Sequence, residues 1–352
     1  MTIIIIFYIF VQSIAHFMDE KFTIHDIARI LKVSPSTVSR ALNDNPRISH
    51  SKREEIQKLA REKGYNRNKL AYSLRLGKTQ TAGVIIPRIT RAFFSNVIGG
   101  LEEVLRTAGF NLIICQTEED YVKEAQNLKT LVNMQVDVIF LSLSAGTVRT
   151  DHLNEIINSG KRLIMFDRVD EKLGIETVKL NDYQGAFDSV QHMLDQGYRK
   201  IIHFGGPENL SVYKERKQGY IDALKANNIS YIKVIPDIIT RESGRKAFLQ
   251  VRKEKNLPDG IFAASDFSAL GAILSARDLN LKIPEDIGIA GFANEPFTEY
   301  VYPGITSTDQ KGHLMGQRIA ELFLNDPNGN KKHSETISPE LIIRKSTLKN
   351  NL

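Results

Sequence analysis

The residues of this chain that could do chemistry are spaced for binding rather than for catalysis. Its eight histidines are scattered without metal-ligand spacing, and its one cysteine, Cys115, ends an apolar run as core residues often do. Gly205-Gly206 follows another apolar run, but the Lys-Ser/Thr pair of a phosphate-binding P-loop does not follow it. The sequence therefore predicts a protein that is not an enzyme and that uses no metal or cofactor.

Basic side chains are concentrated in one short block near the N-terminus. Residues 19–80 contain 14 Lys and Arg against 7 Asp and Glu, whereas the rest of the chain contains 33 against 34. A local excess of this kind indicates a polyanionic partner for this block, either a nucleic acid or an anionic membrane.

The first seventeen residues, MTIIIIFYIFVQSIAHF, are apolar and carry no Lys, Arg, Asp or Glu. As a helix, the stretch Ile3–Phe17 would be roughly 22 Å long, short of the ~30 Å hydrocarbon core, and the segment lacks the basic start and cleavage site of a signal peptide. We expect residues 1–21 to be an N-terminal extension, with Met18 as the natural start, and we expect no membrane partner. A single cysteine is typical of a reducing, cytoplasmic setting.

The basic block has the apolar periodicity of short helices. Apolar residues recur at i, i+3, i+4 and i+7 from Ile24, and Thr23 stands where an N-cap is needed. Ser34-Pro35 supplies an N-cap and a first-turn proline for a second helix over 35–43. A third helix, capped by Ser49 or Ser51, ends at Gly64.

The second of these helices presents small polar groups and one arginine, but no acidic residue. Arg40 can donate two hydrogen bonds to O6 and N7 of guanine, while small neighbours let a helix enter the major groove. The alternative is a plain three-helix bundle with a hydrophilic surface, but the local basic excess favours a helix-turn-helix over residues 24–43. The presented side chains are Ser36, Thr37, Ser39, Arg40 and Asn43.

These residues carry a resemblance to a known family. The runs IHDIARILKVSPSTVSRALNDNPRIS and KGYNRNKLAYSLRLGKTQTAGVIIP resemble the head and hinge of the LacI/GalR family of bacterial regulators. The resemblance covers about residues 22–345. It implies a dimeric, sequence-specific transcriptional regulator, expected to be a repressor, that binds a pseudo-palindromic operator in double-stranded DNA under allosteric control of a small-molecule effector, a sugar or sugar derivative.

The resemblance also assigns DNA-contacting roles within a head of residues 22–77. Leu74 matches the leucine that wedges into the minor groove, on a hinge helix over 68–76 that is too short to be stable alone. Pro35, Ser36 and Arg40 match base-reading positions. The positions that match other DNA contacts are Ser34, Thr37, Ser39, Asn43, Ser49, Tyr65, Asn68 and Ala71.

Beyond residue 80, apolar runs alternate with helical stretches. This alternation predicts doubly wound α/β sheets, and about eight or nine strands fit two sheets better than one. The resemblance implies a two-lobed, periplasmic-binding-protein-like domain over 80–345 that binds effector and dimerises. It places the lobe boundary near Leu180-Asn181 and further crossings near 305–309 and 325–335. The expected strands are Ala82–Pro87, Leu112–Cys115, Val138–Leu141, Arg162–Phe166, Lys200–Phe204, Gly260–Ala264 and Ile287–Gly291.

Ligands of open α/β sheets bind at the carboxyl ends of strands, where this chain has charged and aromatic residues. Bidentate donors and acceptors above an aromatic floor suit the vicinal hydroxyls of a sugar or the edges of a nucleobase. The resemblance likewise places the positions of Arg216, Arg168, Asp266 and the loop after the first strand in the effector cleft. The predicted effector-binding residues are Phe93, Phe94, Asp167, Arg168, Arg216, Asp266 and Asn294.

One departure from the family bears on the effector. Many sugar-responding members have an Asp where this chain has Ala293, so Asn294 or Glu295 must replace it, or the effector differs in kind. A corepressor that is a partner protein stays open as an alternative. A second alternative is an exported sugar-binding transport component, which would share the two-lobed fold but has no use for a helix-turn-helix.

Overall fold

The computed structural model describes residues 22–65, 79–236, 238–254, 257–330 and 332–349. The chain divides into two compact units, Met1–Gly77 and Lys78–Leu352. The extension over 1–21 and the hinge helix expected over 68–76, with Asn68, Ala71 and Leu74, lie outside the described residues.

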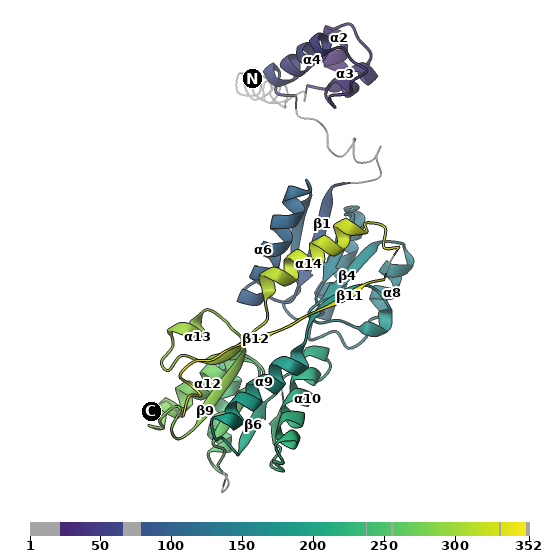
Figure 1. Cartoon of the computed structure of the whole chain (residues 1–352). Coiled ribbons are helices and arrows are strands. Elements are labelled where there is room, and N and C mark those ends of the chain that lie inside the picture. Colours follow the sequence, from purple (N-terminus) through teal and green to yellow (C-terminus); the bar gives the residue numbers. More distant parts are fainter. Residues whose placement is uncertain (1–21, 66–78, 237, 255–256, 331, 350–352) are drawn as a thin grey trace, which may run out of the picture. The chain divides into compact units, whose positions relative to one another are not determined.

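Within residues 22–65, the described part of the first unit, three short helices surround a small apolar core (Figure 1). Thr23 forms a capping box with Asp26, and the Ser34 hydroxyl accepts a hydrogen bond from the backbone N–H of Thr37, as the sequence predicts. Ser49, one of the two predicted caps, is the N-cap residue of the third helix, although its side chain makes no capping hydrogen bond. The helices are α2 (Ile24–Ile30), α3 (Pro35–Ala41) and α4 (His50–Glu62).

The second unit consists of two lobes, each built on a six-stranded sheet within the described residues. The sheet of the first lobe has the strand order β11-β5-β4-β3-β1-β2, and all of its pairs are parallel. Helices α6 and α14 lie side by side over this lobe (Figure 1). Its elements are β1 (Thr81–Ile86), α6 (Ala92–Thr107), β2 (Asn111–Gln116), α7 (Tyr121–Asn133), β3 (Val138–Leu141), α8 (Asp151–Asn158), β4 (Arg162–Phe166), the 3-10 helix η1 (Glu171–Leu173), β5 (Thr177–Leu180), α14 (Gly312–Asn325) and β11 (Ser334–Ile337).

The sheet of the second lobe has the order β12-β10-β9-β8-β6-β7, and only its edge pair β10–β12 is antiparallel. Helices α9 and α10 pack against each other on this lobe (Figure 1). Its elements are α9 (Asp182–Asp195), β6 (Ile201–Phe204), α10 (Ser211–Ala226), β7 (Val234–Ile235), α11 (Arg241–Val251), β8 (Gly260–Ala263), α12 (Asp266–Asp278), β9 (Gly288–Ala293), α13 (Phe297–Tyr300), β10 (Thr306–Asp309) and β12 (Glu340–Ile342).

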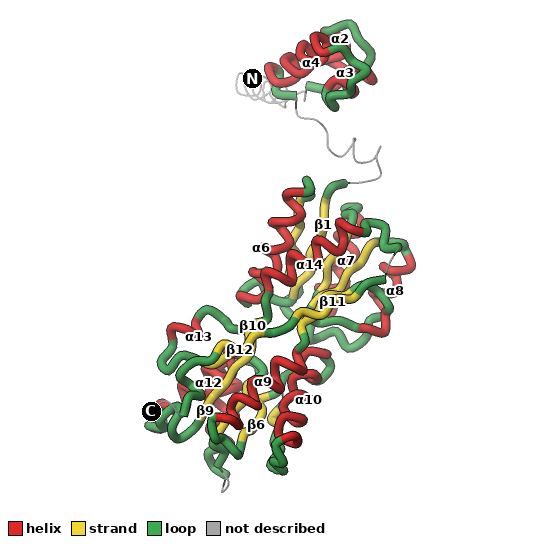
Figure 2. Tube along the Cα trace, viewed as in Figure 1, coloured by secondary structure: helices red, strands yellow, loops and turns green. Residues whose placement is uncertain are grey.

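The predicted fold class is confirmed: a helical head precedes two doubly wound lobes, and all seven predicted strands are present. The chain first passes between lobes where β5 ends at Leu180, as predicted. It crosses back between Asp309 and Gly312, and crosses last between Ile337 and Glu340. Figure 2 shows β11 and β12 as consecutive strands of different lobes. The expected crossing at 325–335 is wrong, because β11 first pairs with β5 in the first sheet.

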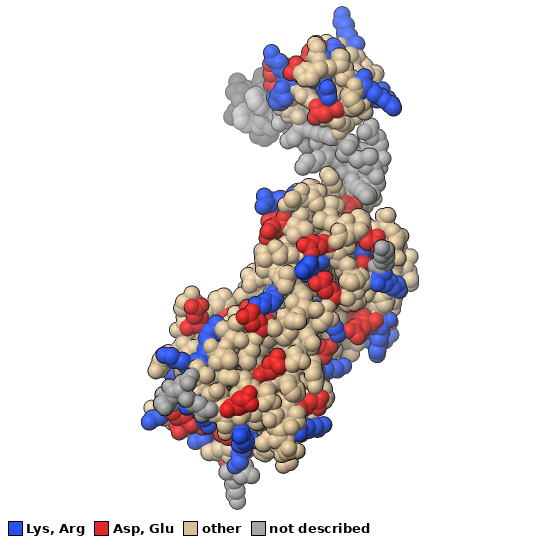
Figure 3. Space-filling model, in the orientation of Figure 1, with Lys and Arg blue, Asp and Glu red and all other residues tan. Residues whose placement is uncertain are grey.

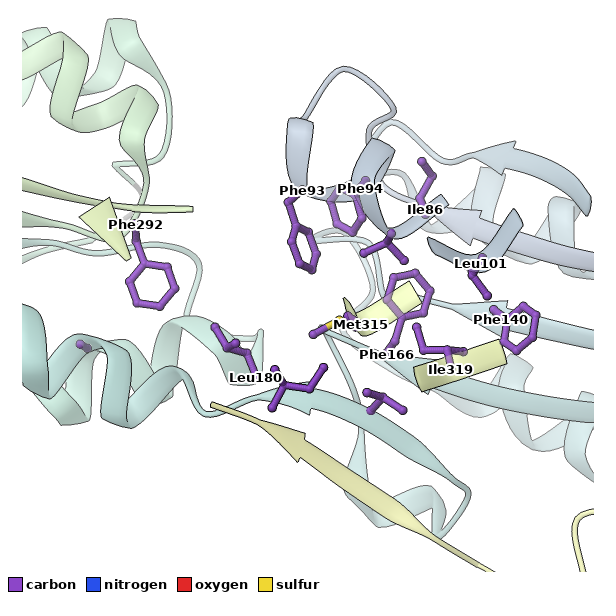
Figure 4. Close-up of a cluster of buried hydrophobic side chains, with 14 of the residues drawn as sticks. Ile86, Phe93, Phe94, Leu101, Phe140, Phe166, Leu180, Phe292, Met315 and Ile319 are labelled. Atoms are coloured by element: carbon purple, nitrogen blue, oxygen red, sulfur yellow. The ribbon is translucent and has the colours of Figure 1, made fainter. Parts of the chain in front are cut away.

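The apolar core extends to the inner ends of both lobes. Phe93 and Phe94 lie at the start of α6, and Phe292 lies at the end of β9 in the other lobe (Figure 4). All three side chains are at most 7% exposed. Both lobes therefore contribute aromatic rings to the space between them.

Candidate functional site

Helix α3 of the first unit presents its polar side chains as predicted. Ser36 and Arg40 are exposed, and the Arg40 guanidinium forms no hydrogen bond or ion pair with the described part of the chain. Thr37 and Asn43 are half-buried and already engaged: the Thr37 hydroxyl lies 2.9 Å from that of Ser34, and the Asn43 amide donates to the Ser39 carbonyl at 2.6 Å. Arg40 is thus a long side chain on this face of α3 whose N–H donors are available to a ligand outside the described part of the chain.

The remaining predicted contacts of the head surround this helix. Pro35 and Ser49 are exposed at the starts of α3 and α4, whereas Tyr65 is half-buried against the core of the unit. Lys and Arg side chains stand out from the surface of this unit in Figure 3, with fewer acidic ones among them. This surface can offer cationic and hydroxyl groups to phosphate oxygens.

A cavity of about 700 Å³ lies between the two lobes of the second unit. Its walls come from the carboxyl ends of β1, β4, β8 and β9 and from the loops and helices that follow them. Five of the seven predicted effector residues line it: Phe93, Phe94, Asp167, Arg168 and Arg216. The position agrees with the rule that open α/β sheets bind ligands beyond their carboxyl edges.

Hydrogen bonds and a ring contact fix the side chain of Arg216 in the wall of this cavity. Its Nε and Nη2 atoms both lie 2.7 Å from Oδ1 of Asp182, and Nη1 donates to the Ala264 carbonyl at 2.8 Å. Its guanidinium carbon lies 3.8 Å from the centroid of the Phe292 ring. Burial raises the pKa of Asp182 to about 7, although the charge of Arg216 opposes this shift. Sequence reasoning missed Asp182, which lies 34 residues before its partner.

Arg168 and Asp167 form a second charged group on the opposite wall. The Arg168 guanidinium donates to Glu119 at 2.7 Å and lies 3.8 Å from the Asp167 carboxylate. Asp167 is 4% exposed, and burial raises its pKa. Glu119 was not predicted, because it stands in a loop after β2 that carries no motif.

Asp266 does not line the cavity, in contrast to the prediction that it binds the effector. Its side chain is fully buried, where Oδ1 accepts from the Ser307 hydroxyl at 2.6 Å and Oδ2 accepts from the backbone N–H of Glu295 at 2.8 Å. It therefore joins β10 to the loop after β9. The preceding residue, Ser265, faces the cavity instead.

Asn294 is also outside the cavity, in contrast to the prediction. Its amide donates to Asp309 at 3.1 Å, and its carbonyl accepts from Arg344 at 2.9 Å, so both ends of the side chain are used within the lobe. Its neighbours Ala293 and Glu295 line the cavity. Of the two replacements for the missing Asp that the sequence left open, Glu295 is thus the one that lines the cavity.

The lobes contact each other on both sides of the cavity. The Glu295 carboxylate accepts from the backbone N–H of Ala92 at 3.3 Å, and the Asn209 amide donates to the Ala145 carbonyl at 2.8 Å. Each of these hydrogen bonds joins one lobe to the other. A change in the angle between lobes would break or form them.

The described residues include no group of three or more His, Cys, Asp or Glu placed to hold a metal ion. No helix in the described ranges is long and apolar enough to cross a membrane.

A helix-turn-helix unit and a two-lobed unit with a polar cavity, in one chain, define a class of DNA-binding regulators. The family of bacterial regulatory proteins of the lacI type matches residues 23–68, and a periplasmic binding protein-like domain matches residues 190–347. The chain therefore belongs to the LacI family and is a DNA-binding transcriptional regulator, not an enzyme.

Relatives over nearly the whole chain support this assignment. Catabolite control protein A of Priestia megaterium is 32% identical over 312 residues, which are 86% of this chain and 92% of the relative. The transcriptional repressor CytR of Escherichia coli K12 is 31% identical over 332 residues, 92% of this chain and 96% of the relative. The structure of the Lac repressor dimer bound to operator and the anti-inducer ONPF has a TM-score of 0.83 at 21% identity, covering 93% and 99% of the two chains, and agrees in fold.

Proposed function

We propose that this regulator is a cytoplasmic repressor whose affinity for its operator is set by a small sugar-like effector bound between the lobes. In this proposal residues 22–77 bind DNA, and residues 80–345 bind the effector and dimerise. The observation that carries the proposal is the cavity itself, because its volume of about 700 Å³ falls in the usual range for small-molecule sites.

The groups that line the cavity suit a ligand with several hydroxyls. Fixed guanidinium and carboxylate groups, Arg168 and Arg216 with Glu119 and Asp167, offer paired donors and acceptors. Phe292 and the aromatic residues at the start of α6 offer flat apolar faces. Sugars bind to such surfaces by stacking their C–H faces while their hydroxyls make bidentate hydrogen bonds.

On the DNA side, the proposal assigns base reading to Pro35, Ser36 and Arg40 on α3. Arg40 is exposed and has no partner in the described part of the chain, so it can donate to a guanine without first breaking an ion pair. Ser34, Thr37, Ser39 and Asn43, with Ser49 and Tyr65, are proposed to fix the helix on phosphates, and Asn68, Ala71 and Leu74 to contact the operator centre.

A homodimer matches a pseudo-palindromic operator and also accounts for exposed apolar side chains. Ile114, on the edge strand β2, is 44% exposed, and Tyr300 and Tyr302 are 80% and 77% exposed. Apolar surface of this kind is typical of protein–protein contacts, and a second copy of the chain is the partner that we propose.

The test is operator binding with and without effector. Full-length protein is titrated into labelled DNA from the region upstream of its own gene and into random DNA of equal length, at one salt concentration because phosphate contacts depend on salt. We expect specific binding that changes when sugars or sugar derivatives are added. Equal affinity for both DNAs, or no response to any compound that binds the cavity, would contradict the proposal.

The exported transport component is not supported as an alternative. The family match over residues 23–68 includes the helix-turn-helix, which such a protein does not need.

A further inference from the structure

Arg91 stands apart from the other charged residues of the cavity. It lies in the loop between β1 and α6, is half-buried, and lines the cavity. Its guanidinium carbon lies 3.7 Å from the centroid of the Phe267 ring in the other lobe. It forms no ion pair or side-chain hydrogen bond with any described residue.

Every other arginine of the cavity is in ion-pair contact with a carboxylate. Arg91 is influenced by the charge of Glu295, but that carboxylate instead accepts a hydrogen bond from the backbone N–H of Ala92. The pairs formed by the other arginines are Arg216–Asp182 at 2.7 Å, Arg168–Glu119 at 2.7 Å, Arg241–Glu242 at 2.6 Å and Arg88–Glu119 at 4.0 Å.

Arg91 is a half-buried cation without a contacting anion, and removing an unpaired charge from water is energetically unfavourable. Burial lowers the pKa of Arg91; the charge of Glu295 opposes this shift and the positive charge of Arg88 adds to it. Arg88, from the same loop, also lines the cavity, where its side chain is 47% exposed. An anion bound beside Arg91 would offset the cost of burying its charge.

Two neutral polar side chains that line the cavity are also available to a ligand. The Gln310 side chain is 5% exposed and the Tyr213 side chain 8% exposed, and both line the cavity. Neither their amide nor their hydroxyl hydrogen bonds to any of the described residues. The polar atoms of both side chains are open to the cavity, so they can hydrogen bond to a ligand without first losing a partner in the protein.

We propose that the effector carries an anionic oxygen group, a phosphate or a carboxylate, which Arg91 binds with help from Arg88. The planar guanidinium suits two oxygens of either group, and its stacking on Phe267 fixes its plane. The polyol part of the ligand then lies toward Arg216 and Phe292. This inference rests on the proposed function, since it names the chemical class of the same effector.

The experiment compares neutral and anionic ligands of equal size on the full-length protein. Isothermal titration calorimetry with glucose, glucose 6-phosphate, glucuronate, ribose, ribose 5-phosphate and inorganic phosphate measures each affinity. We expect at least one anionic compound to bind about tenfold or more tightly than its neutral parent, about 1.4 kcal/mol. The phosphate and carboxylate arms show which group is preferred.

The variants then assign the preference to Arg91. Arg91→Gln is expected to abolish the difference between the anionic ligand and its neutral parent while leaving the affinity of the parent within about twofold. Arg91→Lys keeps the positive charge but loses the paired N–H donors of the guanidinium. It is expected to keep part of the difference in affinity between the anionic ligand and its neutral parent. The control is Arg106→Gln on α6, the helix that follows Arg91, because that side chain is 72% exposed and pairs with Glu102 outside the cavity.

Three results would overturn the inference. Neutral parents that bind as tightly as the anions exclude an anion subsite. An equal loss for both ligand types in Arg91→Gln makes Arg91 a contact between the lobes. No binding of any anion up to about 10 mM, where even weak phosphate sites fill, excludes the site altogether. If neutral sugars still bind and change operator affinity, only this inference fails and the proposed function stands.

Discussion

Replacing Arg216 by alanine is expected to lower the stability of the second unit by an amount that depends on pH. The substitution removes the guanidinium that pairs with Asp182, whose side chain is 1% exposed. It also removes the hydrogen bond to Ala264 and the stacking on Phe292. These last two losses do not depend on pH and together amount to roughly 1–3 kcal/mol.

The pH-dependent part comes from Asp182. Burial raises its pKa from 3.8 to about 7 in the folded protein, so it is protonated in the folded state when it is already ionised in the unfolded chain. The contribution of Asp182 to stability is therefore greatest below about pH 4 and falls by ~1.4 kcal/mol per pH unit until Asp182 ionises near pH 7. In the variant no guanidinium favours ionisation, so the pKa of Asp182 lies higher and the fall continues above pH 7. The difference between wild type and variant should thus grow by ~1.4 kcal/mol per unit above pH 7.

Urea unfolding of the full-length proteins at pH 5, 7 and 9 measures this difference. We expect a similar loss at pH 5 and 7 and a further loss of about 3 kcal/mol at pH 9. The controls are the Asp182→Asn variant and the double variant Asp182→Asn/Arg216→Ala. Because neither has a titrating group at position 182, the difference between their unfolding free energies should not vary with pH. A wild-type-to-variant difference that is the same at all three pH values would refute the electrostatic role assigned to Arg216 and Asp182. At pH 6, where the variant is folded, it should bind operator within about threefold of wild type but lose its response to effector.

Three other substitutions test other parts of the molecule. Arg40→Ala should weaken specific operator binding by about 1–3 kcal/mol and relax preference at one base pair per half-site, whereas an equal loss on random DNA would make it a phosphate contact. Gly219→Ala would place a methyl group 2.3 Å from the Tyr183 carbonyl oxygen, so it should lower the unfolding free energy by roughly 1–3 kcal/mol. The control for it is Gly99→Ala, whose nearest neighbour would be 3.7 Å away and which should not destabilise. Leu74→Ala should reduce DNA bending in a circular-permutation gel without changing effector affinity, and unchanged bending would exclude the wedge.

Apolar runs and caps made most of the fold predictable. Apart from the partly exposed edge strand β2, the strands that the sequence indicates are buried apolar segments, and such runs are read directly from the residues. Strand β10, with the sequence TSTD, was missed because its first three residues are buried hydroxyl residues without apolar periodicity. Each hydroxyl is satisfied by a distant partner, respectively Thr347, Asp266 and Ser189, and no local pattern reveals such partners.

Helix starts were also predicted too late. The sequence pattern predicts helices from Gly185 and from Arg216, whereas α9 begins at Asp182 and α10 at Ser211. This error concealed the partner of Arg216, since Asp182 is the first residue of α9. The residues of a first turn are polar for two different reasons, capping and site formation, and the sequence alone does not separate them.

The two errors within the cavity have one geometric cause. The loop after β8 and the loop after β9 were both expected to point a polar residue at the ligand, and in both the structure selects a neighbour: Ser265 instead of Asp266, and Ala293 with Glu295 instead of Asn294. In both loops the predicted residue instead hydrogen bonds within its own lobe, so an error of one residue exchanges the cavity for the interior. Asp266 and Asn294 are polar because they join β10 to these loops, which fixes the cavity wall. A polar residue at a strand end is therefore evidence that a site is near, but its hydrogen-bond partners decide whether it binds the ligand or holds the residues that do.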